Sequence, residues 1–188
     1  MTVTVLWQRL DVPGLEHCHV VDGPDGVGLH GSVIVAEDGA PLRVEYEVVC
    51  SPAWVTRRAL VTVRDGEAVR RLELTADDRR RWWVNGREIE ALAGCADVDL
   101  SLSPGTNALP VRRLGLLDLP AGESREATAA WVGFPELSVE PLAQRYTGLG
   151  GGRFRYEAAS GFVTELELDE RGLVVAYPPL WRRVAIRR

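Results

Sequence analysis

The sequence predicts a mostly β, antiparallel protein that forms a single domain over residues 1–188. Apolar and polar residues alternate with a period of two along many short segments, and Gly, Pro, Asn and Asp separate these segments. Convincing helical periodicity is confined to Glu88–Ala96 and the residues after Pro104. A chain of 188 residues also has the size of one all-β domain.

The amino-terminal half predicts a run of antiparallel strands. We expect them at Thr2–Leu6, Leu15–Val21, Leu29–Ala36, Leu42–Val48, Trp54–Arg64 and Ala68–Thr75. A loop over residues 22–26 separates two of these strands, and Glu37-Asp38-Gly39 and Asp65-Gly66 carry the Asp-Gly signal of a tight hairpin. Residues 77–81 predict a charged turn.

The stretch Trp82–Leu114 is the densest in chemical features. Asn85-Gly86 favours the positive φ angles of a two-residue hairpin. Strict alternation over 97–103 predicts a strand with Asp97 and Asp99 on one face and an apolar second face that meets the core. The helical segment that follows is short, because Pro104-Gly105 ends the strand and Pro110 limits a helix that Thr106 or Asn107 could cap.

The carboxy-terminal half predicts an antiparallel meander. Strands are expected at Ser124–Val132, Leu137–Tyr146, from Phe154, at Phe162–Leu168, Leu173–Tyr177 and Trp181–Ile186. Pro141 fits only an edge or a bulge, since proline cannot donate to a ladder. The glycines of Gly148–Gly152 predict a flexible loop rather than a phosphate-binding loop, because the spacing and the following helix are absent.

Several motifs resemble the glycolipid-binding family of bacterial proteins, which was first catalogued as a domain of unknown function. They include Trp-x-x-Asn-Gly-Arg at 82–87, Gly94-Cys95-x-Asp97-Val98-Asp99-Leu100 and Thr106-Asn107-x-Leu109-Pro110-Val111-Arg112-Arg113-Leu114, with Gln144-x-Tyr146, Tyr156 and Tyr177-Pro178 in the order that the family shows. The resemblance covers essentially the whole chain. It implies a β-roll, similar to lipid-carrying half-barrels, that wraps around one short helix, and it implies a glycolipid as ligand.

Composition excludes several classes of protein. A net charge of −5 argues against general binding of nucleic acid. Apolar residues at 46% and charged residues at 26% are typical of a globular chain. The sequence has no apolar run of the roughly 18–20 residues that span a bilayer, and its start lacks a signal-peptide pattern, so we expect the cytoplasm. Cys18, Cys50 and Cys95 are expected to be reduced and partly buried.

We expect neither a metal nor a cofactor. His17 and His19 share a strand face at a spacing that can chelate a metal, and His30 is the other histidine, but two ligands do not make a site. We therefore interpret the two as half-exposed strand residues.

Asp97 and Asp99 lie about 7 Å apart along the predicted strand and could act as an acid and base pair on a sugar. Alternatively, Arg112 or Arg113 folds back and neutralises them. The sequence has no Gly-x-Ser-x-Gly motif, and we assign no catalytic residue.

Binding of an amphiphile is the function that the residues and the resemblance favour. Six tryptophans, several beside arginines, offer apolar faces next to cationic groups. The predicted ligand-binding residues are Trp54, Arg57, Trp83, Asp97, Asp99, Asn107, Arg112, Tyr146 and Tyr177. We expect an elongated apolar cavity that holds the tail, with the sugar or anionic head at its mouth.

Two alternatives remain open. One is a hydrolase-type enzyme that acts on a sugar or phosphate group with Asp97, Asp99 and Arg112. The other is a structural interaction protein. In either case Asn107 and Arg112 are expected to be structural or site-forming, and Arg112→Ala is expected to cost about 1–3 kcal/mol if its partner is buried.

Overall fold

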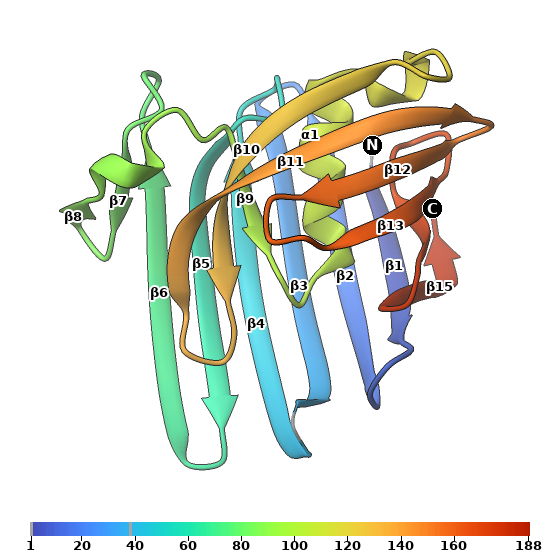
Figure 1. Ribbon diagram of the computed structural model, residues 1–188. Helices are drawn as coiled ribbons and strands as arrows, with labels where there is room; N and C mark the ends of the chain where they lie inside the picture. Colours follow the sequence, from blue (N-terminus) through green and yellow to red (C-terminus); the bar gives the residue numbers. More distant parts are fainter. Residues whose placement is uncertain (1, 38) are drawn as a thin grey trace.

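The alternating segments of the sequence form fifteen strands in the computed structural model, which describes residues 2–37 and 39–188 (Figure 1). The strands of the first half are β1 (Thr2–Arg9), β2 (Gly14–Gly23), β3 (Gly26–Glu37), β4 (Ala40–Cys50), β5 (Thr56–Asp65), β6 (Ala68–Ala76), β7 (Trp82–Val84) and β8 (Arg87–Glu88). Those of the second half are β9 (Asp97–Leu100), β10 (Ser124–Gly133), β11 (Ser138–Gly150), β12 (Arg153–Ala158), β13 (Val163–Leu168), β14 (Val174–Tyr177) and β15 (Trp181–Arg187). The prediction of a mostly β protein is confirmed.

All fifteen strands belong to one open sheet, in the order β8-β7-β6-β5-β4-β3-β2-β1-β15-β14-β13-β12-β11-β10-β9. Neighbouring strands are antiparallel except for the parallel pair β9 and β10. The first strand pairs with the last, so the two chain termini lie in the middle of the sheet and its edges come from the centre of the sequence. In this order β9 is an edge strand, and this edge of the sheet lies inside the roll.

The sheet rolls up so that β10–β13 cross over the long strands β2–β5, with the helical segment between the two layers (Figure 1). That segment consists of the 3₁₀ turn η2 (Pro104–Asn107), the helix α1 (Ala108–Arg113) and the 3₁₀ turn η3 (Leu116–Asp118), while η1 (Glu90–Leu92) precedes β9. The β9 edge meets the start of β5, where Thr56 N–H donates to Ala96 O at 3.1 Å and Val98 N–H donates to Thr56 Oγ1 at 3.0 Å. The predicted roll around one short helix is therefore confirmed.

Three tryptophans fill much of the interior. Trp7, Trp82 and Trp181 are each no more than 1% exposed. Two of them also bridge elements, since Trp7 Nε1 donates to Val174 O at 2.8 Å and Trp82 Nε1 donates to Cys95 O at 2.9 Å. Burial with a satisfied indole N–H is the usual state of such residues, and it leaves limited space for a ligand.

Most predicted elements are confirmed, and the Asn85-Gly86 hairpin is observed with φ angles of 48° and 81°. The strand predicted from Trp54 begins only at Thr56, because Trp54 lies in a turn with φ 63°. Pro141 lies beyond the end of β12, whose pairing with β11 starts at Gln144, as an edge position requires. The Glu37-Asp38-Gly39 signal falls partly on Asp38, which lies outside the described residues.

Two local predictions are wrong, and a third, the capping of the short helix, holds in part. Gly148–Gly152 is a tight hairpin rather than a flexible loop, because β11 continues to Gly150 and β12 starts at Arg153. The helical pattern at Glu88–Ala96 produces only the three residues of η1. Ser103 caps the preceding 3₁₀ turn η2, and its Oγ accepts from Gly105 N–H at 3.1 Å, whereas Asn107 occupies the N-cap position of α1 without a side-chain capping bond.

Candidate functional site

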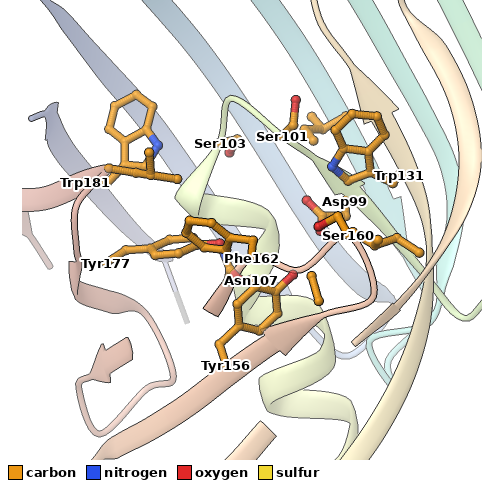
Figure 2. Close-up of a pocket in the computed structure, with 14 residues that line it drawn as sticks. Asp99, Ser101, Ser103, Asn107, Trp131, Tyr156, Ser160, Phe162, Tyr177 and Trp181 are labelled. Atoms are coloured by element: carbon orange, nitrogen blue, oxygen red, sulfur yellow. The ribbon is translucent and has the colours of Figure 1, made fainter. Parts of the chain in front are cut away.

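A cavity of about 180 Å³ lies in the second half of the roll, between the residues that lead into α1 and residues of β10, β11, β12, β14 and β15 (Figure 2). Five aromatic side chains contribute to its walls: Trp131, Tyr156, Phe162, Tyr177 and Trp181. Five polar side chains also line it: Asp99, Ser101, Ser103, Asn107 and Ser160. The cavity thus combines aromatic surface with hydrogen-bonding groups.

The aromatic rings form one connected cluster that extends behind the cavity. The centroids of Tyr156 and Tyr177 are 6.1 Å apart, those of Phe162 and Tyr177 are 6.0 Å apart, and Tyr146 packs on Tyr156 at 5.2 Å. The interplanar angles of 51–77° give tilted and edge-on pairs, which are the arrangements that aromatic quadrupoles favour. Neighbouring rings therefore hold one another in place and leave ring faces and edges toward the cavity.

Asp99 is the charged group of the cavity. Its Oδ2 accepts a 2.6 Å hydrogen bond from Gln144 Nε2, and Gln144 Oε1 in turn accepts from the hydroxyl of Tyr146 at 3.1 Å. Burial raises the pKa of Asp99 to about 6, the bond from Gln144 opposes this shift, and the neighbouring charge of Asp97 adds to it. The side chain keeps some accessible surface because it faces the cavity.

Asp97, two residues earlier on the same face of β9, has a different environment. It is 1% exposed and forms a two-pronged ion pair with Arg113, with Nε–Oδ1 at 2.9 Å and Nη2–Oδ2 at 2.6 Å. Burial raises the pKa of Asp97 and the guanidinium of Arg113 opposes the rise. From the sequence, the aspartates could form an acid and base pair or be neutralised by an arginine. At Asp97 the second alternative holds, because Arg113 of α1 neutralises the carboxylate.

The loop that supplies Ser101, Ser103 and Asn107 is anchored to the first half of the chain through a buried acid. Glu16 is fully buried on β2 and accepts hydrogen bonds from Ser103 Oγ at 2.6 Å and from the hydroxyl of Tyr46. The Tyr46 ring reaches Glu16 by crossing β3 at Gly31, where a Cβ would lie 2.1 Å from a ring atom. The absence of a side chain at Gly31 thus allows the contact that fixes this wall of the cavity.

Burial raises the pKa of Glu16 to about 7, although the bonds from Ser103, Tyr46 and the backbone of Gly105 oppose the shift. The second oxygen, Oε2, is buried, and no group in the described part of the chain donates to it. Glu16 does not line the cavity, but Ser103 connects it to the cavity wall.

Comparisons with known proteins agree with this architecture. The family model described as "Putative glycolipid-binding" matches residues 4–183. The chain belongs to this family. A crystal structure of a DUF1089 family protein from Pseudomonas aeruginosa, at 1.80 Å resolution, is similar with a TM-score of 0.78 and 33% sequence identity, over 91% of this chain and 92% of that chain. No functionally curated protein matches the sequence.

The nine residues predicted from the sequence fall into three places within this family fold. Asp99, Asn107 and Tyr177 line the cavity. Asp97 and Tyr146 lie directly behind it, next to Gln144. The remaining four, Trp54, Arg57, Trp83 and Arg112, lie outside it.

Trp54 and Arg112 form an outer cleft of about 410 Å³ together with residues of the helical segment. The guanidinium of Arg112 lies 5.1 Å from the centroid of the Trp54 ring and 3.5 Å from Asp22. Arg57 pairs with Asp78, and Trp83 packs under Arg81, so both belong to the surface around β5–β7. The constellation Asp97, Asp99 and Arg112 is therefore not assembled at one point, because the neighbouring Arg113 takes the place at Asp97.

Several residues of the cavity were not predicted as site residues. Tyr156 and Ser103 line the cavity, and Gln144 lies behind it and binds Asp99. Their positions in the sequence indicate strands and strand ends but do not indicate a cavity. Among the described residues, no group of three His, Cys, Asp or Glu side chains could hold a metal ion; His19 faces His30 across β2 and β3. Of the helices in the described ranges, none combines the length and apolarity that crossing a bilayer requires.

Proposed function

We propose that the protein binds a glycolipid with the sugar head inside the cavity and the hydrocarbon chains outside it. The observation that carries this proposal is the combination of aromatic rings with a carboxylate, an amide and hydroxyl groups around one small space. Rings supply flat apolar surface to a sugar, and the polar groups can pair with its hydroxyls. The family description is in accord with such a ligand.

The size of the cavity supports this orientation. A volume of about 180 Å³ is close to the roughly 150 Å³ that accommodates one benzene ring, and it is below the roughly 300–1,000 Å³ of pockets that enclose larger ligands. One sugar ring fits this scale, whereas a long acyl chain does not. The orientation is therefore the reverse of the tail-inside arrangement that we expected from the sequence.

The rim gives the hydrocarbon chain a place to begin. Leu142, Phe162 and Leu180 line the cavity and are partly exposed, and Leu10, 46% exposed, joins Leu180 through a backbone hydrogen bond of 2.8 Å. Methylene groups next to the sugar would lie on this apolar rim, with the rest of the chain in a membrane or a detergent micelle.

Calorimetric titration with methyl, hexyl and octyl glycosides below their critical micelle concentrations tests the proposal. We expect all three to bind one site, with a modest gain per methylene that stays below the roughly 0.8 kcal/mol of full burial. Phe162→Ala should weaken the binding, and Phe134→Ala is the matched control because Phe134 is also partly buried but does not line the cavity. Saturable binding of a fatty acid together with no binding of any glycoside would overturn the proposal.

A further inference from the structure

The cavity has an acid but no base among its lining residues. Asp99 is the ionisable carboxylate in the lining, and neither arginine nor histidine contributes to the walls. Two arginines lie nearby, but each pairs with another acid. Arg113 pairs with Asp97, and Arg9, whose Cζ lies 5.3 Å from the centroid of the Trp181 ring, donates two hydrogen bonds to Asp11. The unmatched charge that faces the cavity is therefore negative.

Asp99 also has a free acceptor. Gln144 occupies Oδ2, and no donor among the described residues reaches Oδ1. Gln144 is a neutral donor, so it satisfies one oxygen without neutralising the carboxylate, in contrast to the guanidinium at Asp97. A partly buried carboxylate without a cation costs stability, and such a cost is typical of a group that binds a charged ligand.

Aromatic rings complete a site for a cation. Tyr156, Tyr177, Phe162, Trp131 and Trp181 surround the space beside Asp99 (Figure 2). The negative face of an aromatic ring attracts an ammonium group, and rings combined with an acid form the known type of ammonium-binding cage. The net charge of −5 favours the approach of a cation as well.

We propose that the sugar head bound in this cavity carries a protonated amine, as an unacetylated amino sugar does, and that Asp99 binds this amine. The inference rests on the proposed function and specifies its ligand. Asp99 Oδ1 accepts a charge-assisted hydrogen bond from the ammonium group, and the rings of Tyr156 and Tyr177 lie against the ammonium and the sugar. Gln144 acts as a positioning residue that holds the carboxylate through Oδ2.

The test compares three methyl glycosides of one hexose: the glucoside, the glucosaminide and the N-acetylglucosaminide. By calorimetry or ligand-detected NMR at pH 7, we expect the methyl glucosaminide to bind at least about tenfold more tightly than the two uncharged glycosides, because only its ammonium group can form a charge-assisted hydrogen bond. Asp99→Asn should remove the preference, because asparagine keeps an acceptor for Gln144 Nε2 but loses the charge. Glu165→Gln, at an exposed acid on β13, is the matched control and should retain it.

Lowering the pH from 7 to 5 provides a second readout that needs no variant. The groups that face Asp99 are Asp97 and its partner Arg113, Gln144 and Tyr146 from β11, Tyr156 from β12 and Tyr177 from β14. The pKa of Asp99, about 6, lies in this window, so the preference for the amine should decline toward pH 5 as Asp99 becomes protonated.

The outcomes separate this inference from the proposed function. Equal binding of all three glycosides would overturn the cationic head and leave glycoside binding intact. Binding of none of them would overturn the proposed function itself. Tight binding of free choline with no binding of the glucosaminide would also overturn the inference, because the ammonium would then come from a head group without a sugar.

Discussion

Asp97 and Asp99 lie two residues apart on one face of β9, yet the fold gives them opposite environments. Arg113 neutralises Asp97 through two hydrogen bonds, and the pair is buried almost completely. Asp99 receives one hydrogen bond from the neutral Gln144 and faces the cavity. The comparison teaches that the partner of a carboxylate, rather than the carboxylate itself, separates a structural position from a candidate binding position.

Removal of Arg113 tests the structural side of this comparison and has the largest expected effect. Arg113→Ala leaves the carboxylate of Asp97 buried without a cation, and breaking a buried pair in this way costs about 3–5 kcal/mol. Urea unfolding at pH 7 measures the loss. The double variant Asp97→Asn with Arg113→Ala should recover part of the stability, since no buried charge remains, and a loss below about 1 kcal/mol in the single variant would contradict the structural role.

Glu16 is a third buried acid to compare with the two aspartates. Like Asp99, and unlike Asp97, it has no cationic partner in the described structure. Its pKa rises from 4.5 to about 7, so between these values the folded protein keeps a proton that the unfolded chain has released. The contribution of Glu16 to the free energy of unfolding is therefore complete below pH 4.5, and it declines by about 3 kcal/mol as the pH rises to 7.

Urea unfolding of the wild-type protein and of Glu16→Gln at pH 4.5, 5.5 and 7 measures this effect. The difference in unfolding free energy between the two proteins isolates Glu16 from other titrating groups, because those groups are common to both. We expect the unfolding free energy of Glu16→Gln to increase relative to that of the wild type as the pH rises. A difference that is independent of pH would show that Glu16 keeps an ordinary pKa.

Local features of the fold could be predicted from the sequence, because they depend on residues that are close in the chain. The Asn85-Gly86 turn and the strand that starts at Asp97 are examples, although β9 ends at Leu100 and not at Ser103 as the alternation predicted. Alternation separated Asp97 and Asp99 from Val98 and Leu100, but it did not indicate that the face of the aspartates also lies inside the roll. The failure at Gly148–Gly152 has a physical reason too: glycine permits both a flexible loop and a tight turn, and strand pairing decides between them.

The partners of the site residues could not be predicted, because long-range contacts select them. Gln144 is 45 residues from Asp99, and Glu16 is 87 residues from Ser103. The sequence also left Arg112 and Arg113 as equal candidates for the aspartates. The winding of α1 decides this, since consecutive residues of a helix point about 100° apart. It directs the guanidinium of Arg113 to Asp97 on β9 and that of Arg112 to Asp22 and the Trp54 ring.

Arg112→Ala, with the smallest expected effect, tests this division between the two arginines. Arg112 is 32% exposed, its distance to Asp22 is 3.5 Å, and its guanidinium lies 5.1 Å from the Trp54 ring. An ion pair with this exposure contributes about 0–1 kcal/mol, and a partly exposed cation–π contact contributes about 0.5–1 kcal/mol. We therefore expect a loss of about 1 kcal/mol, at the lower end of what the sequence alone indicated.

Arg113→Ala is the matched control for this variant, because the two substitutions are adjacent in one helix and change helix propensity by the same amount. Urea unfolding of both proteins in 0.1 M and 1 M salt should give a loss for Arg112→Ala that shrinks as salt screens the exposed pair, whereas the loss for Arg113→Ala should change little. Because neither side chain lines the cavity, affinity for the methyl glucosaminide should be retained in Arg112→Ala. Equal losses for the two variants would contradict the assignment of Arg113, rather than Arg112, as the partner that makes Asp97 structural and leaves Asp99 as the charge of the cavity.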